Sequence, residues 1–263
     1  MRPSEFTYHR PGSLEEAVGL LGEEVRPLAG GHSLIPAMKL RLAMPQSLVD
    51  LSGVPGLDEI SVDGNTLRIG AMTAHATVAS SGKVVGSVPV LAEAAALIGD
   101  RQVRQRGTIG GSVAHADPAA DYPTVLVALD ATIAVIGREG AREIPAREFF
   151  TGLFATALGP AELVTAVHVP IRPGTGAAYE KHKSPRSGYA VVGVAATYGG
   201  GAPPELVVGG VTGMPLRAAE AAAKVTGDPD SVAAAAAAVA EAIGEAAIGD
   251  SYASGEYRSH LAT

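Results

Sequence analysis

The chain of 263 residues contains no cysteine and no tryptophan, and only 4% of its residues are aromatic. The lack of cysteine excludes disulfides, cysteine nucleophiles, thiolate zinc sites and cysteine-ligated iron–sulfur clusters held by this chain. The longest apolar run, residues 124–137, is interrupted by Asp130 and is too short to cross a bilayer. No targeting pattern precedes the helix signal at Ser13. We therefore expect a cytoplasmic protein with no transmembrane segment, either free or associated with the inner face of the membrane.

Basic side chains are also scarce, because 20 lysines and arginines stand against 27 aspartates and glutamates, giving a formal net charge of −7. This acidic balance argues against a surface that wraps nucleic acid, so we expect no nucleic-acid partner. Hydrophobic residues make up 47% of the chain and charged residues 18%, which is typical of a globular protein. A chain of this length can bury a full core as one large domain or two unequal ones.

Hydrophobic periodicity and turn residues predict an α+β chain with a boundary at residues 170–174, between a larger part and a smaller one. The predicted helices cover residues 14–21, 34–40, 74–79, 89–98, 119–129, 216–225 and 231–243. The predicted strands cover residues 25–29, 47–51, a hairpin over 57–71, 132–136, 163–169, 177–182, 189–198 and 205–211.

Several of these elements have specific start and stop signals. Ser13 and Glu16 form a capping box ahead of the first helix. The Asp-Gly-Asn turn at residues 63–65 predicts the first hairpin. Residues 107–117 read as a glycine-containing loop, and Pro118 then opens the next predicted helix with an aspartate before it as the N-cap.

Two segments pair adjacent glycines with hydroxyl side chains. They are Ala-Gly-Gly-His-Ser at residues 29–33, directly after a predicted strand, and Thr-Ile-Gly-Gly-Ser at residues 108–112. Glycine permits positive φ and has no Cβ, so an anion can approach the backbone. Successive N–H groups around a concavity bind phosphate oxygens, and the hydroxyls of Ser33, Thr108 and Ser112 add donors. Two such segments suit the two phosphates of a pyrophosphate.

Either segment alone is more simply a turn, since short glycine patterns occur by chance, but together they favour nucleotide binding. The chain has no G-x-x-x-x-G-K-[ST] loop and no G-x-G-x-x-G after a strand, which disfavours a P-loop ATPase and a conventional Rossmann site. No group of His, Asp and Glu shows metal spacing, and no Ser-His-Asp set can be assigned. We therefore predict no metal site and no catalytic residue on this chain.

Residues 26–36, which read Arg-Pro-Leu-Ala-Gly-Gly-His-Ser-Leu-Ile-Pro, resemble the first flavin motif of the medium subunits of molybdenum hydroxylases, the xanthine dehydrogenase family. Residues 107–112, continuing to Asp-Pro-Ala-Ala-Asp at 117–121, resemble the second motif. The resemblance is strongest to the medium subunits of aerobic carbon monoxide dehydrogenases, which share His32. Further matching segments extend the resemblance over nearly the whole chain: Ile69–Thr73, Tyr179–Lys181 and Glu256–Arg258.

This resemblance implies a fold and a cofactor. The fold is a flavin-binding domain of the p-cresol methylhydroxylase/vanillyl-alcohol oxidase (PCMH/VAO) type with two subdomains, over residues 1–172. A small C-terminal α+β domain, a three-stranded antiparallel sheet with helices, follows over residues 173–263. The implied cofactor is non-covalent FAD, with molybdopterin and [2Fe–2S] clusters on partner subunits.

The resemblance also implies positions for the cofactor-binding residues. Residues 29–33 and 108–112 would cradle the pyrophosphate. Positions along the adenosine and ribityl portions would be Ala71, Thr73, Asp117 and Asp121. Leu163 would contact the adenine end or the ring edge, and Lys181 and Tyr189 would lie near the isoalloxazine. The full set is Arg26, Leu28, Ala29, Gly30, Gly31, His32, Ser33, Leu34, Ala71, Thr73, Thr108, Ile109, Gly110, Gly111, Ser112, His115, Asp117, Asp121, Leu163, Lys181 and Tyr189.

Two departures from the family pattern concern the flavin contacts. Ser112 stands where many members have asparagine, and its shorter reach would make one phosphate contact water-mediated. Residues 187–188, Ser-Gly, replace the acidic residue that commonly precedes the tyrosine at position 189.

Several single residues have a simpler alternative role. His32 is a phosphate contact, a covalent attachment point of the flavin, or a turn residue. Asp117 is either a helix N-cap or a flavin contact, and both roles are compatible. Asp121 is either a ribityl ligand or a solvated carboxylate. Lys181 is either a cation beside the flavin N1/C2=O or part of an exposed charged strand edge. His115 is either a loop histidine or a ligand.

The resemblance implies a function shared among several chains. A large subunit would oxidise the substrate at its molybdopterin, a small subunit would carry the [2Fe–2S] clusters, and this chain would pass electrons through FAD to quinone, NAD⁺ or O₂. The assembly would be a dimer of heterotrimers, with the arginines of residues 101–106 either solvated or docking a partner. Two alternatives stay open: a stand-alone flavin oxidoreductase of the same fold, and a non-catalytic nucleotide-binding assembly module.

Overall fold

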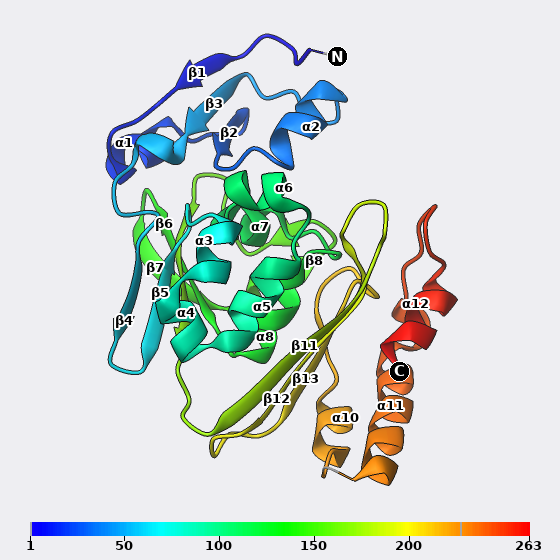
Figure 1. Cartoon of the computed structure of the whole chain (residues 1–263). Helices are drawn as coiled ribbons and strands as arrows, with labels where there is room; N and C mark the ends of the chain where they lie inside the picture. The colour runs from blue at the N-terminus through cyan, green and yellow to red at the C-terminus, as the bar shows by residue number, and fades with distance from the viewer. Residues whose placement is uncertain (1, 227) are drawn as a thin grey trace.

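The computed structural model describes residues 2–226 and 228–263, which form three sheets of more than two strands with helices between and around them (Figure 1). The N-terminal unit is a parallel sheet in the order β1-β3-β2. Ser13 accepts a hydrogen bond from the Glu16 amide at 3.1 Å, which confirms the predicted N-cap of its first helix. Its elements are β1 (Thr7–His9), α1 (Leu14–Leu20), β2 (Val25–Leu28), α2 (Leu34–Lys39), β3 (Ser47–Asp50) and the 3₁₀ turn η1 (Leu51–Gly53).

The middle unit is an antiparallel sheet in the order β4-β5-β10-β6-β7, and helices cover one of its faces (Figure 1). The predicted hairpin is confirmed as β4 and β5, with Gly64 at φ +52° in its turn. The main core lies between this sheet and the helices, and Tyr122 and Phe149 are its largest fully buried side chains.

The strands of the middle unit are β4 (Ile60–Asp63), β5 (Thr66–Gly70), β6 (Thr132–Gly137), β7 (Gly140–Pro145) and β10 (Leu163–Pro170), with a two-stranded ribbon of β8 (Phe150–Gly152) and β9 (Ala155–Thr156). Its helices are α3 (His75–Ser80), α4 (Gly82–Ser87), α5 (Pro89–Leu97), α6 (Arg101–Arg106), α7 (Ile109–His115), α8 (Asp121–Ala128) and α9 (Ala146–Phe149).

The C-terminal unit is an antiparallel sheet in the order β11-β12-β13-β14. One face packs on α8, where a Cβ on Gly209 would lie 1.9 Å from the Thr124 hydroxyl, so only glycine lets the helix approach so closely. The other face packs on α10 and α12 (Figure 1). The elements are β11 (Thr175–Lys183), β12 (Ala190–Gly199), β13 (Glu205–Gly209), β14 (Leu216–Arg217), α10 (Ala219–Lys224), α11 (Pro229–Ile243), η2 (Gly244–Ala246) and α12 (Gly255–Ala262).

Four sequence predictions about elements are wrong in detail. Residues 109–115 are helix α7 rather than loop, because Thr108 caps them and the carbonyls of Ala71 and Thr73 accept their first two amides. The following helix begins at Asp121, not at 119, since the Asp117 side chain accepts the Ala119 amide at 2.9 Å and closes a turn first. Asp117 is therefore not a helix N-cap. Residues 216–217 form strand β14 before α10, so the C-terminal sheet has four strands instead of three.

Candidate functional site

The first glycine segment lies directly on the backbone that leads into the second. A Cβ on Gly30 would be 2.0 Å from the carbonyl oxygen of Arg106 and 2.7 Å from the Cα of Gly107. No side chain larger than hydrogen fits in that space. The turn between β2 and α2 and the turn between α6 and α7 therefore form one continuous backbone surface.

A third segment, residues 71–75, is joined to the second glycine segment by backbone hydrogen bonds. The Ile109 amide donates to the Thr73 carbonyl at 3.0 Å, and the Gly110 amide donates to the Ala71 carbonyl at 2.9 Å. The His75 amide donates in turn to the Gly107 carbonyl at 2.9 Å. Gly110 is required for this packing, since its Cβ would lie 2.4 Å from the Cβ of Ala71. The sequence places these three segments far apart, and the fold joins them.

The two glycine segments differ in how many amides they leave free. In the second segment the first amides of α7 already bond to the protein, including the Gly111 amide, which donates to the Thr108 hydroxyl at 3.1 Å. In the first segment the amides of residues 30–33 donate to no residue that the structure describes. Gly31 has φ +75°, the left-handed conformation that turns successive amides toward one side. The amides of residues 30–33 are therefore the backbone donors of this site that have no acceptor among the described residues.

Buried polar atoms without a partner lie next to these segments. The Thr73 hydroxyl and His75 Nδ1 have no hydrogen-bond partner among the described residues, and both residues are at most 5% exposed. Burial, together with the nearby His32 and Arg104 charges, lowers the pKa of His75 to about 4. His75 is thus neutral at pH 7, while His32 is exposed.

A second cluster joins helix α8 to strand β11. Asp121 accepts a hydrogen bond from the Tyr179 hydroxyl at 2.7 Å. It also forms an ion pair with the Lys181 ammonium at 2.9 Å. The Lys181 side chain is 1% exposed, so the exposed-edge interpretation is wrong, and that of Asp121 is 4% exposed, so the solvated-carboxylate interpretation is wrong. Burial raises the pKa of Asp121 although Lys181 opposes the shift, and burial next to Asp121 raises the pKa of Tyr179. The pair is a buried joint between two units.

The two clusters are connected through the end of α5. Lys181 donates to the Leu97 carbonyl at 3.1 Å, and Arg104 donates to the Ile98 carbonyl at 2.8 Å. Gly188, in the loop between β11 and β12, would bring a Cβ within 3.2 Å of the Gly99 Cα. Residues 97–99 therefore receive contacts from both the helix before the second glycine segment and the C-terminal sheet.

Tyr189 and Asp117 lie at the edge of the second cluster. Tyr189 is 45% exposed, and burial with the nearby charges of Asp117 and Asp121 raises its pKa. Asp117 is half-buried in its turn. These two residues border the surface next to Asp121.

The remaining residues of the expected set are more dispersed. Arg26 is exposed and donates to the carbonyls of Glu23, which precedes β2, and of Val25. His115 is exposed in the last turn of α7, with its ring 5.2 Å from that of Phe154. Leu163 is buried in the core cluster that packs α1 on the middle sheet. Three further members, Leu28, Leu34 and Ser112, are half-buried beside the glycine segments.

Sequence reasoning missed Tyr179, His75 and Arg104 as members of the site. For Tyr179 a signal existed, because residues two apart on a strand share a face and Lys181 was already in the expected set. The other two residues are adjacent to the site only because α3 and α6 pack on the second glycine segment.

The arrangement fits a diphosphate-containing cofactor better than a metal. Free amides, a left-handed glycine and the orphaned Thr73 hydroxyl are donors for phosphate or sugar oxygens. Over residues 2–226 and 228–263, no group of three metal-ligating side chains comes together. Among those same residues, no helix is long and apolar enough to cross a membrane.

Comparison with known proteins agrees with this geometry. A family described as the FAD binding domain in molybdopterin dehydrogenase matches residues 4–172. The carbon monoxide dehydrogenase medium chain of Afipia carboxidovorans is 43% identical over 235 residues, covering 86% of this chain and 82% of that relative. The glyceraldehyde dehydrogenase medium chain of Sulfolobus acidocaldarius is 41% identical, covering 86% and 83%. A chain in the solved structure of carbon monoxide dehydrogenase from Hydrogenophaga pseudoflava has a TM-score of 0.94 at 39% identity, covering 100% of this chain and 94% of that one.

Proposed function

The chain belongs to the family of FAD binding domains in molybdopterin dehydrogenases, and from that membership we propose that it holds FAD in an electron-transfer role between an iron–sulfur partner subunit and a terminal acceptor. It is the FAD-binding medium subunit of a molybdenum hydroxylase-type oxidoreductase. Bound FAD supplies the chemistry that this role needs, because a flavin takes up electrons singly and releases them in pairs. The acceptor would be a quinone, NAD⁺ or O₂.

The observation that supports this proposal most directly is the row of free amides at residues 30–33. Amides that point to one side around a left-handed glycine bind phosphate oxygens. The Thr73 hydroxyl is an orphaned buried donor beside the same surface. We propose that these groups hold the pyrophosphate and the adjoining sugar, with Gly111 and Ser112 on the facing wall.

For the ring end of the cofactor, we propose the surface bordered by Asp117 and Tyr189, next to the buried Lys181. Lys181 is held by Asp121 and by the Leu97 carbonyl, so its ammonium has a fixed position. Its charge is largely compensated by the carboxylate, and we expect only a modest effect of the pair on the potential of the flavin. The chain thus orients the cofactor, and none of its residues acts as an acid or base.

The substrate site and the iron–sulfur clusters are assigned to partner subunits in this proposal. The chain has no cysteine, so thiolate-ligated iron–sulfur clusters must lie on a partner. Relatives of nearly equal identity belong to a carbon monoxide dehydrogenase and a glyceraldehyde dehydrogenase by name. We therefore propose that a large molybdopterin subunit selects the substrate and that two heterotrimers form the complex.

The experiment uses the purified complex carrying Gly31→Ala. Its visible spectrum is recorded first, and the reduction of its flavin and clusters by substrate is then followed without oxygen. An alanine at φ +75° strains the turn and displaces the amides, so we expect FAD affinity to fall by about tenfold while the partner subunits stay bound. Gly56→Ala is the matched control, since Gly56 has φ +76° and no neighbour within 4 Å of a Cβ.

Three outcomes would overturn the proposal: a wild-type complex without FAD, a flavin that stays oxidised while the clusters are reduced, or unchanged flavin affinity in the Gly31 variant. Turnover by the isolated chain would instead favour a stand-alone oxidoreductase.

A further inference from the structure

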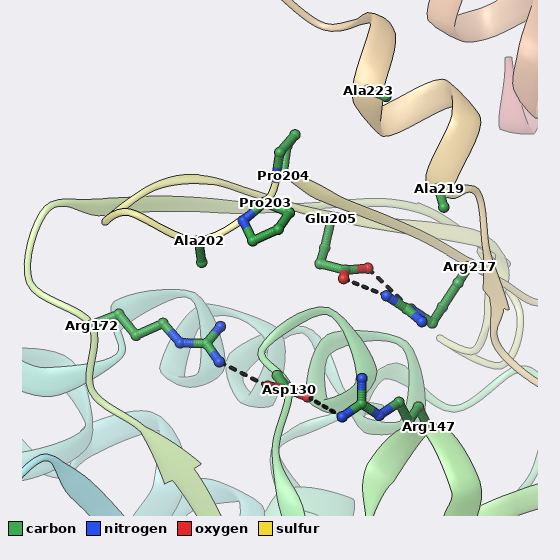
Figure 2. A pocket seen from close by; sticks show the side chains of 10 residues that line it. All are labelled: Asp130, Arg147, Arg172, Ala202, Pro203, Pro204, Glu205, Arg217, Ala219 and Ala223. Carbon is green, nitrogen blue, oxygen red and sulfur yellow. Dashed lines mark hydrogen bonds and ion pairs between the residues drawn. The ribbon is translucent and has the colours of Figure 1, made fainter.

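An arginine-rich groove is lined by residues of both the middle and the C-terminal units (Figure 2). Its volume is about 410 Å³, within the range of small-molecule sites. Arg147 and Arg172 point into it from the middle unit and the linker, and Arg217 points into it from β14. Cations from both units therefore converge on one opening.

Most of the guanidinium N–H groups in this groove have no acceptor within residues 2–226 and 228–263. Arg172 donates to Asp130 at 2.8 Å, and Arg217 forms a bidentate pair with Glu205. Arg147 approaches Asp130 only to 3.6 Å, which is too long for a hydrogen bond. Each guanidinium carries five N–H donors. Many donors thus face the groove without an acceptor among the described residues.

The charge of the groove differs from that of the chain. Three arginines stand against the two carboxylates Asp130 and Glu205, giving an excess of positive charge in a chain with net charge −7. The opposite wall, Ala202 to Pro204, presents apolar surface and no charge (Figure 2). The lining therefore offers both a cationic end and an apolar shelf.

We propose that this groove binds the phosphate group of a small phosphorylated molecule, with the phosphate on Arg147 and Arg172 and the organic part on the Ala202–Pro204 shelf. Arginine matches the geometry of phosphate oxygens through paired N–H groups. The ligand contacts both units, because Arg147 belongs to α9 of the middle unit and residues 202–204 lie between β12 and β13 of the C-terminal unit. This site is independent of the flavin site, since α8 begins at Asp121 and Asp130 follows its other end.

The test is isothermal titration calorimetry of the full chain with inorganic phosphate and with phenyl phosphate, at constant ionic strength set with chloride. Both ligands are expected to bind, and tighter binding of phenyl phosphate identifies the apolar shelf. Arg147→Gln is expected to weaken phosphate binding by about tenfold. The control is Arg142→Gln on β7, because its side chain is also 48% exposed but lies outside the groove.

A second variant changes affinity in the opposite direction. Glu205→Gln removes a competing carboxylate and frees Arg217, so phosphate affinity is expected to rise. Circular dichroism of each variant shows whether it is folded. Lack of phosphate binding by the wild-type chain at millimolar concentration, or equal affinities of the Arg147, Arg142 and Glu205 variants, would overturn the proposal.

Discussion

At the scale of single residues, the chemistry beside the glycine segments depends on buried groups that the sequence gives no reason to select. His75 packs its ring against Gly107, whose Cβ would lie 2.6 Å from Nε2. Its ring centroid is 5.3 Å from that of Tyr122, and the polar atoms His75 Nδ1 and Tyr122 OH are both orphaned. Burial keeps this histidine neutral, which gives the chain a pH dependence.

The His75 side chain should make the folded state less stable in acid. Its pKa is about 4 when folded and about 6.5 when unfolded, so only the unfolded state takes up a proton between these values. The free energy of unfolding therefore decreases by about 3 kcal/mol as the pH falls from about 6.5 to 4. His75→Gln cannot titrate, and urea unfolding of the purified chain should show a flatter dependence across that window. If the free energy of unfolding depends on pH in the same way in the wild type and the His75→Gln variant, the low pKa of His75 is contradicted.

At the scale of elements, α7 shows how a glycine-rich sequence can be a helix. Glycine is a poor helix former, yet Thr108 caps residues 109–115 and the carbonyls of Ala71 and Thr73 accept the first amides. Tertiary hydrogen bonds therefore compensate for low intrinsic propensity. The hairpin of β4 and β5 and the capped α1 could be predicted from the sequence because their signals are local.

Gly110→Ala should destabilise this element although alanine favours helices. The new Cβ would lie 2.4 Å from the Ala71 Cβ and 2.7 Å from its carbonyl oxygen, and backbone must shift to make room. We expect a loss of about 2 kcal/mol or more in urea unfolding. Gly86→Ala in α4 meets no atom within 4 Å and should raise stability by about 0.5–1 kcal/mol. A Gly110 variant as stable as the wild type would show that the three segments are not tightly packed.

At the scale of the whole molecule, α8 is the shared element of two units. Its first residue, Asp121, bonds to Tyr179 and Lys181 on β11, and its middle packs on β13 at Gly209. The core cluster of the middle unit includes Tyr179, Ala195 and Val207 of the C-terminal sheet. One face of the C-terminal sheet therefore belongs to the core of the middle unit, while a separate core cluster packs the sheet on α10, α11 and α12.

Lys181→Met should weaken this joint in a pH-dependent way. Removing the ammonium leaves a buried, unpaired carboxylate, which costs about 3 kcal/mol or more at pH 8. Burial already raises the pKa of Asp121, and loss of Lys181 raises it further, so the folded variant binds a proton more readily than the unfolded chain. Its stability relative to wild type should therefore improve as pH falls from 8 to 5.

The matched control for that joint is Arg142→Met, which breaks the surface pair with Glu162. It should cost less than about 1 kcal/mol, because exposed ion pairs contribute little. Guanidinium unfolding measures the stability that the Lys181 variant loses relative to wild type. An equal loss at pH 5 and at pH 8 would contradict a buried charge at Asp121.

The sequence alone determined the local features: the capped first helix, the hairpin, most strands, the two glycine segments and the family. These follow from short-range signals, since turn residues and alternation act within a few positions. Only the tertiary structure decided which amides have no acceptor, because the carbonyls that accept the first amides of α7 come from residues 71–73. It likewise decided that Asp121 and Lys181, 60 positions apart, form one buried pair, since only packing of α8 on β11 removes both charges from water.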